Sequence, residues 1–135
     1  FYGDEVGLTG EEFKSCRQAM IWDQTEQDTE LLEWYRKLIA IRQNNPALRT
    51  GEFELITKDA VKNVYAFTRT KADNQLLIIF NNSNQSAELD YHLSDLGFDA
   101  TELEDLIHNQ TYNVDKQKLS LEVAANGVKV LKTKS

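Results

Sequence analysis

The sequence predicts a mainly β protein: an antiparallel β-sandwich of six to eight strands that follows one amphipathic helix. Between Asp28 and Asn44 the apolar residues recur every three or four positions, as on one side of an α-helix. After Gly51 the spacing becomes two, and turn residues separate short apolar runs about every ten residues. The chain has 135 residues, 41% hydrophobic and 27% charged, which is typical of a folded globular protein.

The helix is predicted over about residues 28–44. Thr25 or Asp28 can cap its first amides, and Pro46 ends it because proline disfavours helical backbone at the residue before it. A sandwich buries its own inner faces, so the helix calls for another partner, such as a sheet or barrel encoded upstream. The residues of its apolar stripe are Leu31, Leu32, Trp34, Tyr35, Leu38, Ile39 and Ile41.

The strands begin with a predicted three-stranded meander. Its strands carry Phe53 and Leu55, then Tyr65 and Phe67, then the continuous apolar run 76–80, which suits a central strand covered on both faces. The connections are expected at 58–62 and 70–74. Further strands are predicted with Ala87, Leu89 and Tyr91 on one face, near residues 101–107, and as a closing hairpin of 119–123 and 128–131 around the turn Ala125-Asn126-Gly127.

Charge and composition exclude several functions. Fifteen Lys and Arg stand against twenty-two Asp and Glu, a net charge of -7, which disfavours nucleic acid and anionic membranes as partners. The longest apolar run, residues 76–80, is too short to span a bilayer. Cys16 is the one cysteine, so no internal disulfide is expected. The first residues carry neither Met nor a signal peptide, so we expect a piece of a longer protein. Because the true N-terminus is then missing, this absence does not bear on secretion, and the location stays open, with the bacterial cytoplasm favoured.

The titratable residues predict no catalytic or metal centre of their own. Asp4-Glu5 and Glu11-Glu12 are adjacent carboxylates, but neighbours on a strand point to opposite faces and so do not flank one bond. His92 and His108 have no other ligand at metal-binding spacing. Glycine-rich phosphate and dinucleotide motifs are lacking, so no cofactor is expected. Exposed aromatic rings can serve as a sugar-binding platform, but we expect Tyr65, Phe67 and Phe80 in the core.

Several segments resemble the α-amylase family of glycoside hydrolases, in particular its neopullulanase and cyclomaltodextrinase branch. The resemblance covers essentially the whole chain and is more specific in the first fifty residues than in the β region. One departure is Ala124-Ala125-Asn126, where many relatives have proline in the last turn. The matching segments are Phe1 to Gly10, Cys16 to Asp23, Leu38 to Arg42, Asn45 to Arg49, Gly51, Val64 to Arg69, Ile79 to Ser83 and Gly127 to Leu131.

This resemblance implies a division into two parts. Residues 1–46 correspond to the end of a (β/α)8 catalytic barrel, its last strand, loop and helix, and residues 47–135 to a Greek-key sandwich of the amylase domain C type. The family's retaining mechanism uses an Asp nucleophile, a Glu acid/base and a second Asp on earlier barrel strands, and none of those motifs is in this sequence. We therefore expect the intact protein to be a glycosidase and this chain alone to be inactive.

The resemblance also implies where substrate would bind. The loop 3–22 would lie at the active-site face of the intact enzyme, with Arg17 either pairing with a carboxylate of the glucose pocket or fixing the loop by a salt bridge. Tyr2, Asp4, Glu5 and Trp22 are weaker candidates. The expected partner is an α-glucan or maltooligosaccharide, held by the missing barrel; starch, maltodextrin, pullulan and cyclodextrin remain alternatives, for α-1,4 or also α-1,6 bonds.

Two other interpretations stay open from the sequence. A carbohydrate-binding module would show exposed aromatic rings and affinity for maltooligosaccharides. A plain packing or dimerisation domain would show no such affinity, and alanine at those rings would change stability alone. The helix stripe, without its partner, also predicts self-association.

Overall fold

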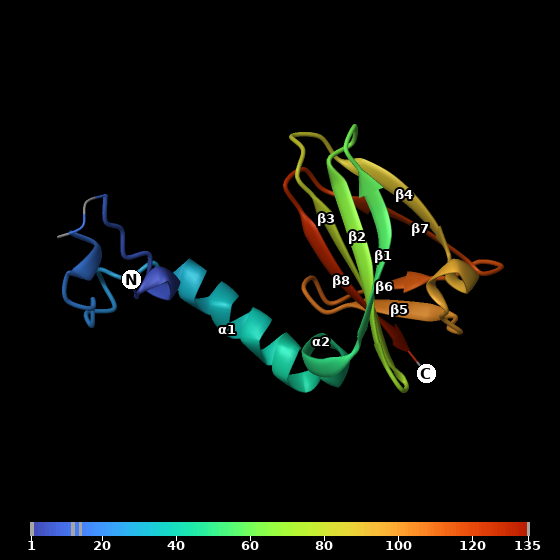
Figure 1. Ribbon diagram of the computed structural model, residues 1–135, viewed down its shortest axis with the longest axis horizontal. Coiled ribbons are helices and arrows are strands. Elements are labelled where there is room, and N and C mark those ends of the chain that lie inside the picture. Colours follow the sequence, from blue (N-terminus) through green and yellow to red (C-terminus); the bar gives the residue numbers. More distant parts are fainter. Residues whose placement is uncertain (1, 12, 14, 135) are drawn as a thin grey trace. The chain divides into compact units, whose positions relative to one another are not determined.

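The computed structural model describes residues 2–11, 13 and 15–134, with the side chain of Cys16 left out. The chain forms two compact units, residues 1–41 and 42–135 (Figure 1). The structure does not test the predicted boundary between residues 46 and 47, which remains a prediction.

The first unit contains the 3₁₀ turns Asp4–Val6 and Ser15–Arg17 and most of helix α1, Thr29–Asn44. The helix prediction is confirmed: the Leu31 amide donates to Asp28 Oδ1 at 2.9 Å, so Asp28 is the cap, and Pro46 opens the next helix. The described residues before α1 form no strand, because a strand needs a neighbouring strand for its hydrogen bonds.

The apolar stripe of α1 is uncovered in this chain. No residue of α1 is buried, and Trp34, Tyr35, Leu38 and Ile39 are each at least 38% exposed. An amphipathic helix is normally stabilised by packing of its apolar side. The expectation that this stripe has a partner encoded upstream stays a prediction.

The second unit is a β-sandwich that follows the short helix α2, Pro46–Thr50. The larger sheet has the order β1-β2-β3-β8-β5-β6, and the smaller sheet pairs β4 with β7 (Figure 1). All pairings between these strands are antiparallel. The strands of the described residues are β1 (Glu52–Asp59), β2 (Val64–Lys71), β3 (Asn74–Asn81), β4 (Ala87–His92), β5 (Glu102–Asp105), β6 (Gln110–Asn113), β7 (Lys118–Val123) and β8 (Val128–Lys134).

The core lies between the two sheets. Inward side chains of the larger sheet, among them Val64, Leu77 and Leu131, pack with Leu119 and Leu121 of the smaller one. The meander β1-β2-β3 and the central position of β3 are confirmed. Alternating burial along β7 and the buried residues of β4 also agree with the predicted period of two.

The predicted closing hairpin is wrong. Leu119, Leu121 and Val123 of β7 pair with β4, whereas β8 pairs with β3 and β5. The turn at Asn126, which has a left-handed φ of 51°, thus carries the chain from one sheet to the other. A short turn between two apolar strands is equally compatible with a hairpin and with this crossing, because both strands bury one face.

The predicted core position of the aromatic residues is also wrong. Tyr65 is 39% and Phe80 43% exposed, and Phe67 is half-buried outside the core cluster. Val64 and Ala66 occupy the inner positions of β2, so the period of two places Tyr65 and Phe67 on the outer face. The larger sheet is therefore apolar on both of its faces along these strands.

Candidate functional site

The loop before α1 carries the residues predicted for a substrate pocket, and backbone contacts hold it together. Gly3 has a left-handed φ of 83°, and a Cβ there would lie 2.9 Å from side-chain atoms of Leu8, so this tight turn requires glycine. The Tyr2 hydroxyl donates to the Gln18 carbonyl oxygen at 2.8 Å. The Asp28 amide donates to the Val6 carbonyl oxygen at 3.1 Å, which joins the start of the loop to the helix cap.

The structure brings two of the predicted residues, Tyr2 and Arg17, into contact. The Tyr2 hydroxyl reaches the carbonyl oxygen of Arg17 at 3.4 Å as well as that of Gln18. The Arg17 guanidinium lies 4.4 Å from the centre of the Phe13 ring, a cation–π distance. Asp4 and Glu5 lie on the first 3₁₀ turn, and the Trp22 ring is 81% exposed.

Next to Trp22, the carboxylate of Asp23 has a pKa that local hydrogen bonds shift. The Thr25 amide donates to Asp23 Oδ1 at 2.9 Å and the Thr25 hydroxyl at 2.8 Å. The amide first and then the hydroxyl lower the pKa of Asp23 below its ordinary value, because both bonds favour the ionised form. Asp23 is thus held as an acceptor that fixes the loop end, not as a proton donor.

A cluster of aromatic rings covers the outer face of β1, β2 and β3. Ring centres of Phe53 and Phe67 lie 5.0 Å apart, those of Tyr65 and Phe67 5.8 Å, and those of Phe67 and Phe80 6.3 Å. Phe53 is 54% exposed. This surface was not predicted from the sequence, although apolar residues at both odd and even positions of β2 are the signal that both faces of the strand are apolar.

A buried ionic cluster lies on the inner side of the larger sheet. Asp105 is fully buried; His108 Nδ1 lies 2.6 Å and Lys129 Nζ 3.2 Å from its Oδ2. An ionised carboxylate only accepts, so the His108 Nδ1 carries the proton. Lys129 Nζ also lies 5.1 Å from the centre of the Tyr112 ring. His108 is three positions from Asp105, but Lys129 is 24 positions away, so no local sequence pattern predicted the cluster.

The environment of this cluster sets its protonation. Burial alone would raise the pKa of Asp105, but hydrogen bonds from His108, the Ile107 amide and Lys129 outweigh it, so this pKa lies below its ordinary value. Burial likewise would lower the pKa of Lys129, but contacts with Tyr112 and Asp105 raise it above its ordinary value. Asp105 and Lys129 are therefore both charged at neutral pH, and their ion pair stabilises the fold.

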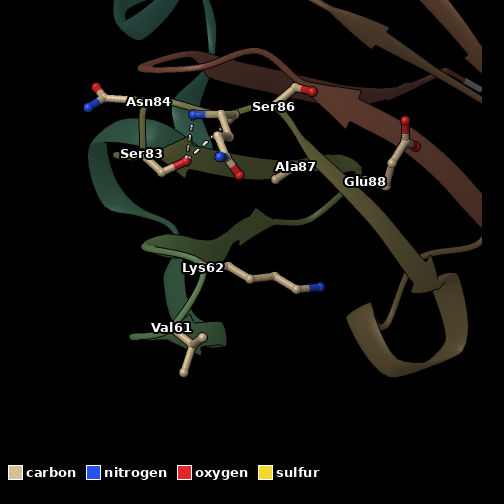
Figure 2. Close-up of a pocket in the computed structure, with 8 residues that line it drawn as sticks. Val61, Lys62, Ser83, Asn84, Ser86, Ala87 and Glu88 are labelled. Carbon is tan, nitrogen blue, oxygen red and sulfur yellow. Dashed lines mark hydrogen bonds between the residues drawn. The ribbon is translucent and has the colours of Figure 1, made fainter.

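A polar pocket opens between the β1–β2 turn and residues 83–88 (Figure 2). The Ser83 hydroxyl donates to the Gln85 carbonyl oxygen at 2.8 Å and accepts from the Gln85 amide at 3.3 Å, which holds the rim. Glu88 is the one carboxylate among the lining residues, and Lys62 is the one cation. Hydrolysis of a glycosidic bond needs two carboxyls, so this pocket does not supply that chemistry.

Within the described residues, no group of three or more His, Cys, Asp or Glu side chains is placed to hold a metal ion. Across the same residues, no helix is both long and apolar enough to cross a membrane.

The chain is similar to larger carbohydrate-active proteins over nearly its whole length. It is 37% identical over 134 residues to a maltogenic α-amylase of Bacillus acidopullulyticus, covering 97% of this chain and 22% of that protein. A solved cyclomaltodextrinase matches 99% of this chain and 22% of its own, with 27% identity and a TM-score of 0.82. The α-amylase of Geobacillus thermoleovorans, solved with acarbose, matches at 20% identity and a TM-score of 0.86, which shows a shared fold.

The chain matches only a small part of each relative. The chain spans 15% to 22% of the length of the first curated relatives that it matches. The family model described as maltogenic amylase, C-terminal domain, matches residues 53–130, which begin in β1 and end in β8. The chain therefore belongs to the maltogenic amylase C-terminal domain family.

Proposed function

We propose that this chain is the C-terminal part of an α-amylase-family glycosidase that hydrolyses the glucosidic bonds of starch, maltodextrin, pullulan or cyclodextrin. The observation that carries the proposal is the 37% identity to a maltogenic α-amylase over 97% of the chain. The bonds are α-1,4, with α-1,6 bonds as a second candidate. The substrate, an α-glucan or maltooligosaccharide, binds to the part of the enzyme that precedes this sequence.

In this proposal the chain itself is not catalytic. A barrel takes about 250 residues and assembles its site from the ends of several strands. Residues 1–46 form the end of the barrel, and residues 47–135 form the C-terminal sandwich, whose role is mainly structural.

The test compares the full-length protein with this 135-residue chain. Both are assayed for reducing sugar released from soluble starch, pullulan and β-cyclodextrin. We expect activity from the full-length protein and no product above the rate without protein from the chain. Hydrolysis by the chain, or a full-length protein inactive on all three substrates, would contradict the proposal.

Arg17 is proposed to bind substrate in the intact enzyme, with Tyr2, Asp4, Glu5 and Trp22 as supporting residues of the same loop. The exposure of Trp22 and the position of Arg17 at the loop's second 3₁₀ turn support this proposal. In the full-length enzyme Arg17→Ala should raise KM, lowering kcat/KM about 10- to 100-fold, the value of a charge-assisted hydrogen bond.

The matched control is Arg36→Ala, which removes a guanidinium paired with Glu33 on the exposed side of α1. It should leave KM and kcat unchanged. The melting temperature of each variant separates binding from a loop-fixing role. A lower melting temperature with unchanged KM in Arg17→Ala would assign Arg17 to loop fixation instead.

A second candidate function is sugar binding by the sandwich, which the exposed rings of Phe53, Tyr65 and Phe80 favour. Aromatic faces stack on the C–H faces of sugars. Titration of the 135-residue chain with maltoheptaose in a calorimeter tests it. Saturable binding that is lost in Phe80→Ala would support this function, and no heat of binding would reject it.

Self-association through the stripe of α1 is also proposed for the isolated chain. Apolar side chains that are exposed along one helix tend to become buried against another molecule. On α1 these side chains are Trp34, Tyr35, Leu38 and Ile39. Size-exclusion chromatography with light scattering should show a mass that rises with concentration, and Leu38→Glu should restore the monomer. A monomer at all concentrations would reject self-association.

A further inference from the structure

The turn between β7 and β8 contains the one Asn-Gly pair of the sequence, Asn126-Gly127. The backbone of the turn favours both residue types. Asn126 has a left-handed φ of 51°, which asparagine adopts more readily than most residues do. A Cβ at position 127 would lie 2.7 Å from the Ala124 carbonyl oxygen, so this position requires glycine. The passage of the chain from one sheet to the other therefore depends on this pair.

An asparagine that precedes glycine is chemically labile, because glycine has no side chain to shield its backbone nitrogen. Once a base has removed its proton, that nitrogen can attack the asparagine Cγ. Ammonia leaves with a proton from water, and a succinimide ring forms. Water then opens the ring at either carbonyl carbon, which gives aspartate, or isoaspartate when the main chain runs through Cγ. The net reaction consumes one water molecule and releases one ammonia molecule.

We propose that Asn126 is a site of spontaneous deamidation in this protein. The Asn126 side chain is exposed, so water and base reach it. Its Nδ2 donates to Asn84 Oδ1 at 3.4 Å, which is long for a hydrogen bond and holds the side chain weakly. The reaction takes place within the chain and needs no other protein, so this inference does not depend on the proposed function.

Hydrogen bonds of the turn limit the rate of this reaction in the folded chain. The Gly127 amide donates to the Ala124 carbonyl oxygen at 3.0 Å, and the Asn126 amide donates to the Ser83 carbonyl oxygen at 2.9 Å. The first of these bonds must open, because the Gly127 nitrogen has to give up the proton that the bond holds. The folded chain should therefore react at least about tenfold more slowly than an unstructured peptide of residues 119–131.

Deamidation at this position affects the fold because Asn81 binds both ends of the turn. Asn81 Nδ2 donates to the carbonyl oxygens of Val123 and Ala124, and the Asn81 amide donates to the Gly127 carbonyl oxygen at 2.9 Å. Isoaspartate inserts one more carbon atom into the main chain between these acceptors, so they lose their present spacing. Aspartate adds a charge on an exposed side chain and leaves the main chain unchanged. Isoaspartate is therefore the product that should lower the melting temperature.

Incubation of the 135-residue chain at mildly alkaline pH, followed by peptide mass spectrometry, tests the proposal. Asn109 is the matched control within the same molecule. It is exposed and has a left-handed φ of 55°, but Gln110 follows it, and the Gln110 side chain shields the backbone nitrogen. We expect Asn126 to convert to aspartate and isoaspartate while Asn109 stays unchanged. An unchanged Asn126, or equal conversion at Asn109, would overturn the proposal.

The synthetic peptide of residues 119–131 tests the chemistry without the need to fold. Gly127→Ala in this peptide should slow the conversion of Asn126, and equal rates in the two peptides would overturn the role of Gly127. Equal rates in the peptide and in the folded chain would overturn the control by the turn.

The isoaspartate form of the chain, separated by chromatography, should melt at least about 2 °C lower than the unmodified chain. The Asn126→Asp variant carries the new charge without the added carbon and should melt within about 2 °C of the unmodified chain. A melting temperature that is unchanged in the isoaspartate form would overturn the expected effect on the fold.

Discussion

Asp105 and Lys129 form an ion pair inside the sandwich. Lys129 Nζ lies 3.2 Å from Asp105 Oδ2, with the carboxylate side chain fully buried and the ammonium side chain 10% exposed. The pair joins the end of β5 to β8 across 24 positions of sequence. Both charges have further partners, His108 and the Ile107 amide for Asp105 and the Tyr112 ring for Lys129, so neither is left uncompensated.

Removing one member of this pair should be costly. Asp105→Ala leaves the Lys129 ammonium buried without its counter-charge, and breaking such a pair typically costs about 3 to 5 kcal/mol. The free energy of unfolding in urea measures the loss. Glu102→Ala, which breaks the exposed pair with Lys134, is the control and should cost at most about 1 kcal/mol. Equal losses in the two variants would show that Asp105 is not an organising residue of the fold.

The Asp105 carboxylate makes the stability of the fold depend on pH in the acidic range. The pKa of Asp105 is lower in the folded protein than its ordinary value of 3.8. Its ionised form therefore stabilises the fold above that value, and the contribution is lost as the pH falls through the lower folded pKa. Urea unfolding of the wild type and of Asp105→Asn from pH 6 to pH 2 should show a difference that shrinks below about pH 4. A difference that stays constant over this range would contradict the assignment.

Asn81 should be a second polar residue on which the sandwich depends. It is 2% exposed, and its Nδ2 donates to the carbonyl oxygens of Gln85, Val123 and Ala124 at 2.8 to 3.1 Å, while its Oδ1 accepts from the Ser83 amide. Asn81→Ala removes these hydrogen bonds, although the Gln85 carbonyl oxygen keeps the Ser83 hydroxyl and the Ala124 carbonyl oxygen keeps the Gly127 amide, so the expected cost is about 1 to 3 kcal/mol in all. Thermal unfolding measures the loss.

The control for Asn81 is its exposed neighbour Asn82. Asn82→Ala keeps the backbone bond from the Asn82 amide to Asn63 and should change stability by no more than about 0.5 kcal/mol. A comparable loss in both variants would mean that the backbone of this turn, and not the Asn81 amide group, carries the stability.

The sequence predicted the elements of this fold better than their partners. The periodicity of residues 28–44 and the capping residue Asp28 predicted α1 correctly, because helix signals lie within the helix segment itself. The strand β6 was not predicted, since its sequence, Gln110-Thr111-Tyr112-Asn113, shows no alternation of apolar and polar residues. The pairing of β7 with β4 was missed because alternation specifies which face is buried but not which strand lies alongside.

The same limit applies to the candidate surfaces. Tyr65 and Phe80 are aromatic residues on strands, so a position in the core was the natural expectation, yet Val64 and Ile79 beside them already fill the inner positions. The cluster of Asp105, His108 and Lys129 depends on β5 lying next to β8, which no local pattern reports. Resemblance to a family identified the loop of Arg17, and the pocket around it stays a proposal.

Substitutions on the two faces of β3 test whether Phe80 lies outside the core. Leu77 is fully buried in the core, whereas Phe80 lies on the outer face of the larger sheet and is 43% exposed. In the 135-residue chain Leu77→Ala should lose about 2 to 5 kcal/mol, because it leaves a cavity between the sheets. Phe80→Ala should lose about 1 kcal/mol or less, because its ring keeps much of its contact with water in the folded state. Urea unfolding of both variants measures these values. A loss from Phe80→Ala that equals the loss from Leu77→Ala would place the Phe80 ring in the core of the sandwich.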